Sequence, residues 1–125
     1  MAKAAKVLMG NRKYCLALDL KNDEELIQEY KRYHKQVWPE VLDSIRSSGI
    51  ENMEIYNVGN RLFMIMTVND KFSFEKKALS DDGNPKVQEW ESMMWKYQQA
   101  LPFAVSGEKW MLMERIFQIE SSISS

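Results

Sequence analysis

The sequence contains a single histidine, His34, so any mechanism that requires an imidazole must use that side chain. Imidazole can donate or accept a proton near neutral pH. Tyr30 precedes it by four residues, a spacing that puts both side chains on one face of a helix. A tyrosine hydroxyl can orient a substrate oxygen or the histidine itself. The pair therefore indicates acid–base chemistry in a small pocket, with packing or helix capping as the alternative interpretation.

Two tryptophans and a carboxylate lie together later in the chain, at Trp90, Glu91 and Trp95. The flat apolar faces of Trp90 and Trp95 suit a sugar ring, whose hydroxyls nearby polar groups would hold. Glu91 could accept hydrogen bonds from such hydroxyls. The alternatives are a tryptophan packed in the core and a glutamate on a solvated helix face. His34, Tyr30, Trp90 and Glu91 are therefore the candidate site residues.

Several other kinds of chemistry are excluded by composition. One histidine and one cysteine, Cys15, cannot build a Cys/His metal cluster or a zinc-protease motif. The sequence has neither a Gly-rich phosphate loop nor a Gly-x-Ser-x-Gly turn. Its 17 basic and 18 acidic residues give a net charge of −1, which provides no broad field for nucleic acid. The nine methionines are explained as fillers of irregular core gaps.

The same composition suggests where the protein is found. No apolar run reaches membrane-spanning length, so we expect no membrane association. The lone Cys15 cannot form an internal disulfide, which fits a reducing compartment, and we expect a cytoplasmic protein. The length of 125 residues fits one domain. We expect it over residues 14–120, between a mobile tail at 1–13 and a polar tail at 121–125.

The first half of this domain predicts a strand, an interrupted helix and a hairpin. Residues 14–20 form an apolar run typical of a strand buried on both faces. The spacing of apolar residues after Asp23 indicates a helix, which Pro39 kinks or breaks. Two strands joined by a tight Gly-Asn turn follow over 52–58 and 62–68.

The second half predicts two helices and a strand. A short helix over 72–79 is followed by a loop at 81–84 and a longer helix over 85–101. Residues 110–119 form the expected last strand. The order strand, helix, strand, strand, helix, strand is typical of the ferredoxin-like α+β fold, an antiparallel sheet with helices on one face. The other face also carries large apolar side chains, and pairing of two sheets into a homodimer would cover them.

Residues 30–40 (YKRYHKQVWPE) resemble the helix signature of the L-rhamnose mutarotase family: a tyrosine, three residues, a histidine, then a hydrophobic residue before Trp-Pro-Glu. Weaker likeness extends over residues 14–119. The resemblance implies a homodimeric ferredoxin-like α/β barrel that interconverts the α and β anomers of a deoxyhexose without a metal or organic cofactor. The family's proton-donating histidine falls on His34, and its substrate-contacting tyrosine and tryptophan fall on Tyr30 and Trp90.

Two positions depart from the family pattern. A second substrate-contacting tyrosine early in the second strand is replaced by Met53, and Tyr56 points to the opposite face of a regular strand. The family's second tryptophan is replaced by Glu91, which exchanges a stacking surface for a carboxylate. The hydroxyl pattern recognised therefore differs, and L-fucose is a candidate substrate beside L-rhamnose.

The hypothesis assigns a role to each candidate residue. His34 donates a proton to the ring oxygen and recovers it on closure. Tyr30 orients the sugar and Trp90 stacks on it, while Glu91 holds a hydroxyl or assists as a base. One acid–base group typically contributes ~10²–10⁴-fold, which is sufficient for a reaction that already proceeds in water. Two alternatives remain, a monooxygenase-like enzyme on the same barrel and a non-catalytic, dimeric small-molecule-binding module.

Overall fold

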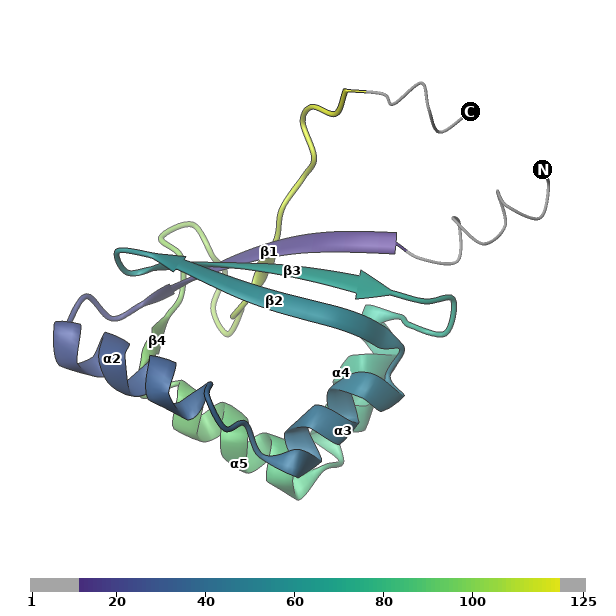
Figure 1. Cartoon of the computed structure of the whole chain (residues 1–125), viewed down its shortest axis with the longest axis horizontal. Coiled ribbons are helices and arrows are strands. Elements are labelled where there is room, and N and C mark those ends of the chain that lie inside the picture. Colours follow the sequence, from purple (N-terminus) through teal and green to yellow (C-terminus); the bar gives the residue numbers. More distant parts are fainter. Residues whose placement is uncertain (1–11, 120–125) are drawn as a thin grey trace.

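The computed structural model describes residues 12–119, which form an antiparallel sheet with all four helices of this range on one face (Figure 1). The strand order is β2-β3-β1-β4, and β5 also pairs with β1. The elements are β1 (Arg12–Leu20), α2 (Glu24–Tyr33), α3 (Pro39–Ser47), β2 (Ile50–Val58), β3 (Arg61–Val68), α4 (Phe74–Asp82), α5 (Pro85–Met94), β4 (Gln98–Gln99) and β5 (Met111–Leu112). The predicted ferredoxin-like α+β arrangement is confirmed. None of the helices within 12–119 has the length and apolar character needed to cross a bilayer.

The core lies between the sheet and the helices, because alternate residues of the strands point toward the helices. In β3 every second side chain is buried, and Leu16 of β1 pairs with Met64 of β3 on that side. One buried cluster joins Leu20 and Leu62 to side chains of α2 and α5. The intervening β3 residues, such as Phe63, are half-buried and face away from the helices. β3 lies inside the sheet, between β2 and β1.

The first long helix is broken and not merely kinked at its proline. The Asp23 side chain accepts a hydrogen bond from the Leu26 amide at 3.1 Å and begins α2. After Tyr33 the helix ends, and Pro39 opens α3 as its first residue, where a missing amide donor costs nothing. Figure 1 shows α2 and α3 meeting at an angle. The break leaves His34 at the C-cap of α2.

The predicted end of the last helix was wrong. α5 stops at Met94, whereas the apolar stripe had predicted helix to residue 101. The chain after it pairs with the edge of β1, where Lys21 donates its amide hydrogen to the Tyr97 carbonyl at 2.8 Å and Leu20 is in register with Gln98. Tyr97 is buried there, so pairing with β1 buries a side chain that a longer helix would also have buried.

The predicted loop at 81–84 was also too long, because α4 continues through Asp82. The Lys77 ammonium lies 2.7 Å from the Asp81 carboxylate, one helical turn away, and stabilises this last turn. Asn84 then accepts hydrogen bonds from the Lys86 and Val87 amides, so the predicted start of the next helix is confirmed.

The ends of the chain differ from expectation as well. β1 begins at Arg12, two residues before the predicted strand, while the rest of the two predicted tails lies outside the described residues. The predicted last strand shrinks to Met111–Leu112. Beyond Met113, whose amide donates to the Cys15 carbonyl at 2.7 Å, residues 114–119 are not part of a strand. Figure 1 shows this segment leaving the sheet on the side opposite the helices.

Candidate active site

A cavity of about 560 Å³ lies between the helices and the sheet, and all four candidate residues line it. Tyr30 and His34 come from α2 and its C-cap, whereas Trp90 and Glu91 come from α5. Met53, which stands where the family has a tyrosine, lines the same cavity. The fold thus brings together residues some 60 positions apart in the sequence, as the acid–base hypothesis requires.

The His34 ring is fixed through one of its nitrogens. Its Nδ1 lies 2.9 Å from the carbonyl oxygen of Tyr30, and the two rings are tilted with centroids 4.3 Å apart. Because a carbonyl only accepts, Nδ1 must carry a proton, and in the neutral ring Nε2 then holds the free lone pair. Burial lowers the pKa of His34 below its ordinary 6.5, and the carbonyl contact opposes this shift. At neutral pH Nε2 is therefore ready to accept a proton.

The Tyr30 hydroxyl remains protonated in the same range. Burial raises the pKa of Tyr30 to about 12; a hydrogen bond with Gln98 opposes this rise, and the negative charge of Glu91 adds to it. The Gln98 Nε2 donates to the Tyr30 hydroxyl oxygen at 3.3 Å. Tyr30 can therefore act as a hydrogen-bond donor toward the cavity.

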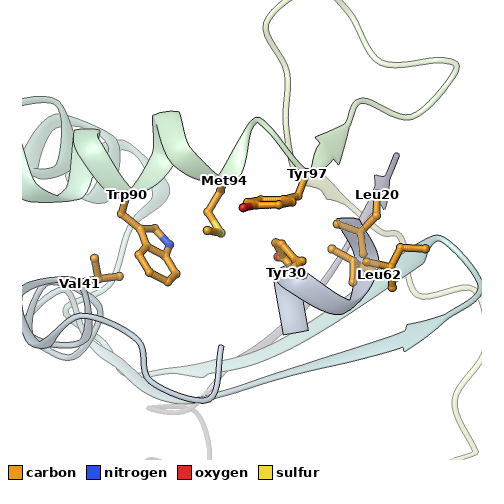
Figure 2. Packing of buried hydrophobic residues seen from close by; sticks show 8 residues of the cluster. Leu20, Tyr30, Val41, Leu62, Trp90, Met94 and Tyr97 are labelled. Atoms are coloured by element: carbon orange, nitrogen blue, oxygen red, sulfur yellow. The ribbon is translucent and has the colours of Figure 1, made fainter. Parts of the chain in front are cut away.

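Trp90 belongs both to the core and to the cavity wall, so its two interpretations from the sequence are compatible. Only 5% of its surface is exposed to solvent. Its ring meets those of Trp38 and His34 edge to face, with centroids 5.2 Å and 5.7 Å away. Figure 2 shows it extending from α5 toward Val41. Such packing holds the indole in one orientation against the cavity.

Glu91 lies at the rim of the cavity, where its side chain is 44% exposed and forms an ion pair with Lys109. The Lys109 ammonium also lies 4.8 Å from the centroid of the Trp95 ring. Trp95 lies outside the cavity wall, so the suggestion that it offers a stacking face there was wrong. Lys109 connects α5 to the loop before β5, next to Trp110, which does line the cavity.

Several cavity residues were missed by sequence analysis. Gln98 had been placed in a helix, and no local pattern indicated the strand that turns it toward the cavity. A polar cluster at the α3 and α4 side joins Ser44, Lys77 and Asp81, with the Ser44 hydroxyl donating to Asp81 at 2.9 Å. The four-residue spacing of Lys77 and Asp81 could have indicated their ion pair. Within 12–119, no group of three or more His, Cys, Asp or Glu side chains is arranged to hold a metal ion.

The Tyr30–His34 pair also borders a second, smaller cavity of about 170 Å³. Tyr30, His34 and Ile55 line both cavities. The second one is bounded on its outer side by Lys31 and Lys35, which are exposed. The imidazole therefore stands between two spaces and is not sealed in packing.

The sequence and the fold are both similar to those of sugar mutarotases. The family model described as L-rhamnose mutarotase matches residues 13–119. An L-fucose mutarotase of Xanthomonas campestris pv. campestris is 42% identical over 118 residues, 93% of this chain and 94% of that protein. An L-rhamnose mutarotase of Listeria monocytogenes is 31% identical over 72 residues, 56% of this chain and 62% of that protein. The crystal structure of an L-rhamnose mutarotase from Formosa agariphila has the same fold, with a TM-score of 0.63 and 22% identity over 87% of this chain and 99% of that one.

Proposed function

The chain belongs to the L-rhamnose mutarotase family, a family of isomerases, and we propose that it interconverts the α and β anomers of a deoxyhexose by acid–base catalysis at His34. The observation that carries this proposal is the fixed imidazole at a cavity that it shares with Tyr30 and Trp90. A 560 Å³ cavity lined by apolar side chains together with polar and charged ones is of the kind that binds a polar small molecule.

The reaction needs one proton acceptor and one proton donor at a single carbon. Nε2 of neutral His34 takes the proton of the anomeric hydroxyl, and the imidazolium so formed gives a proton to the ring oxygen. The bond between C1 and the ring oxygen breaks, and C1 becomes an aldehyde carbon. Rotation of the aldehyde followed by the reverse transfers closes the ring on the other face. Because both oxygens are bonded to C1, one positioned nitrogen can serve both.

The remaining candidate residues hold the sugar. The Tyr30 hydroxyl donates a hydrogen bond to it, since this phenol keeps its proton at neutral pH. Trp90 offers an apolar surface for the ring, and its packing against Trp38 and His34 keeps that surface in place. Glu91 accepts a hydrogen bond from a hydroxyl, and its ion pair with Lys109 favours this role over that of a base.

The proposed substrate is L-fucose, with L-rhamnose as the second candidate. Support comes from the 42% identity to the Xanthomonas L-fucose mutarotase over nearly the whole chain, against a shorter match to the Listeria enzyme. Met53 and Glu91 add to it, because they replace two aromatic positions of the rhamnose pattern with side chains of different chemistry.

We further propose a cytoplasmic homodimer that needs no cofactor. The helix-free sheet face carries half-buried Phe63 and Ile65, and a second copy of the chain would cover them. The exposed Ile116 and Phe117 lie beyond that face and could extend the contact. Cys15 is free, which is consistent with a reducing compartment.

The test is anomer exchange followed by saturation-transfer NMR with L-fucose, L-rhamnose and their epimers. His34→Gln is expected to abolish the enzyme-dependent exchange, since glutamine cannot transfer a proton at neutral pH. Arg32→Gln, an exposed change two residues away, is the matched control and should leave exchange intact. Exchange that survives in His34→Gln would remove His34 from the mechanism, and sugar binding without any exchange would favour the binding-module alternative.

A further inference from the structure

One cavity residue has hydrogen-bonding capacity that the protein itself does not use. Gln98 is 4% exposed and lines the large cavity. Its Oε1 is the one buried side-chain nitrogen or oxygen, among residues 12–119, without a hydrogen-bond partner. Native proteins leave few such atoms unpaired, and each that remains calls for an explanation, such as strain, a catalytic role or a bound water or ion. The unpaired amide therefore needs a functional explanation.

The unused capacity belongs to the pair that Gln98 forms with Tyr30. As oriented, the amide donates from Nε2 to the Tyr30 oxygen, which leaves the Tyr30 hydroxyl hydrogen and Oε1 without partners in the pair. If the amide is inverted, Tyr30 donates to Oε1, and the two Nε2 hydrogens and a lone pair of the Tyr30 oxygen are left over. In both orientations at least one donor and one acceptor remain. A hydroxyl group, which donates and accepts at once, is the complementary ligand.

The position of Gln98 in the fold supports a ligand role over a structural one. β4 is held to β1 through its backbone, in register with Leu20, and this pairing does not need the carboxamide. A methionine or leucine would fill the same space without an unpaired polar atom. Gln99, the next residue on the strand, is exposed and points to the other side. Gln98 thus keeps a polar group at a buried position where packing alone would favour an apolar side chain.

We infer that Gln98 is a substrate-binding residue that, together with Tyr30, recognises one ring hydroxyl of the sugar. This inference rests on the proposed function. The terminal torsion of glutamine has broad minima, so the amide can rotate to meet the ligand at little cost. A site built to hydrogen-bond a hydroxyl discriminates against an analogue that lacks it, because its own polar groups are then left unpaired. Gln98 would therefore help decide which deoxyhexose is bound.

The experiment measures binding of L-fucose and of its 2-, 3- and 4-deoxy analogues by titration calorimetry, in the wild type and in two variants. In the wild type, one analogue should bind at least about tenfold more weakly than L-fucose. In Gln98→Met, the difference in affinity between L-fucose and that analogue should shrink, because Tyr30 alone then contacts the hydroxyl. Gln99→Met is the matched control and should keep the wild-type discrimination. Thermal unfolding checks that both variants fold.

A second measurement uses the wild type alone, so that it does not depend on a variant that folds. The side-chain NH₂ resonances of Gln98 should shift on titration with L-fucose, while those of Gln99 should not. Discrimination unchanged in folded Gln98→Met, or Gln98 resonances that do not move while anomer exchange proceeds, overturns the inference and leaves the proposed function standing. Absence of sugar binding and of exchange in the wild type overturns both.

Discussion

His34 has one reactive nitrogen, because Nδ1 lies 2.9 Å from the Tyr30 carbonyl oxygen. A carbonyl only accepts, so Nδ1 carries a proton in the neutral and in the charged ring alike. The acting form in the proposed cycle is the neutral ring, whose pKa is lowered below 6.5 by burial. We therefore expect kcat/KM for anomer exchange to be level at neutral pH. It should fall as the pH is lowered through that pKa, since protonation fills the Nε2 lone pair.

This pH profile is measured by saturation transfer after subtraction of the exchange catalysed by buffer and water. His34→Gln, which is expected to have no enzyme-dependent exchange, should give only the background rate at every pH. A rate that rises when His34 becomes protonated would contradict the neutral form as the starting state and favour an imidazolium that begins the cycle as proton donor.

Glu91 depends on Lys109 for its orientation at the cavity rim. We predict that Lys109→Met raises KM roughly 2- to 5-fold with little change in kcat, the range that a partly exposed ion pair corresponds to. Lys109→Arg should retain most of the affinity, because it restores the charge. Lys86→Met, which removes an exposed pair with Glu89 at 3.6 Å, is the control. A large loss of kcat in Lys109→Met would instead assign Glu91 or its partner to the proton transfers.

At the scale of elements, the cavity depends on where each helix stops. Gly49 ends the connection between α3 and β2 with a φ of 101°, and a Cβ there would lie 2.6 Å from the Asn69 side-chain oxygen and 2.9 Å from the Phe72 amide nitrogen. Because the next residues of β2 line the cavity, this turn also positions part of its wall.

We therefore expect Gly49→Ala to lower the free energy of unfolding by clearly more than the ~1–2 kcal/mol of a left-handed alanine alone. Gly107→Ala is the matched control, since its φ is also positive, at 86°, and nothing lies within 4 Å of the place that an alanine methyl would take there. Urea unfolding of both variants measures the difference. Equal losses would mean that the surroundings of Gly49 relax without cost.

The end of α5 also shapes the site, because Gln98 lies beyond it, in a strand and not on a helix face. Met94, the last residue of α5, is 2% exposed within the core cluster. Met94→Ala should cost about 2–5 kcal/mol of unfolding free energy through the cavity it leaves. Met113→Ala, at a 46% exposed position, should cost far less, as measured by the same urea titration. A small loss at Met94 would argue against tight packing at this junction.

At the scale of the whole molecule, the helix-free sheet face is the surface on which the homodimer proposal depends. Sedimentation velocity of the wild type should give a mass twice that of the chain. Ile65→Glu should shift it toward monomer, because a charge replaces a half-buried apolar side chain on that face. Leu79→Glu, at an exposed apolar position on α4, should leave the mass unchanged. A wild-type monomer at all concentrations would contradict the proposal.

The sequence alone determined the elements whose signals are local. Apolar periodicity, the Asp23 and Asn84 caps, Pro39 and the Gly-Asn turn are read from neighbouring residues, so most helices and the central strands could be predicted. The four-residue spacing of Tyr30 and His34 likewise indicated two residues of the candidate site. These features depend on contacts within one or two turns of chain.

Only the tertiary structure decided which residues meet. A stripe of apolar residues can be buried by a helix or by a strand. Here residues 98–99 pair with the open edge of β1 and do not extend the predicted helix. Residues 114–119 form no strand, although their pattern predicted one and the β1 edge beside residues 12–14 is not paired with β4 or β5. Gln98 reaches Tyr30 across 68 positions of sequence, and no local pattern encodes that contact. Long-range pairing depends on which backbone edges remain free after the chain has folded, so the complete cavity was beyond the reach of spacing alone.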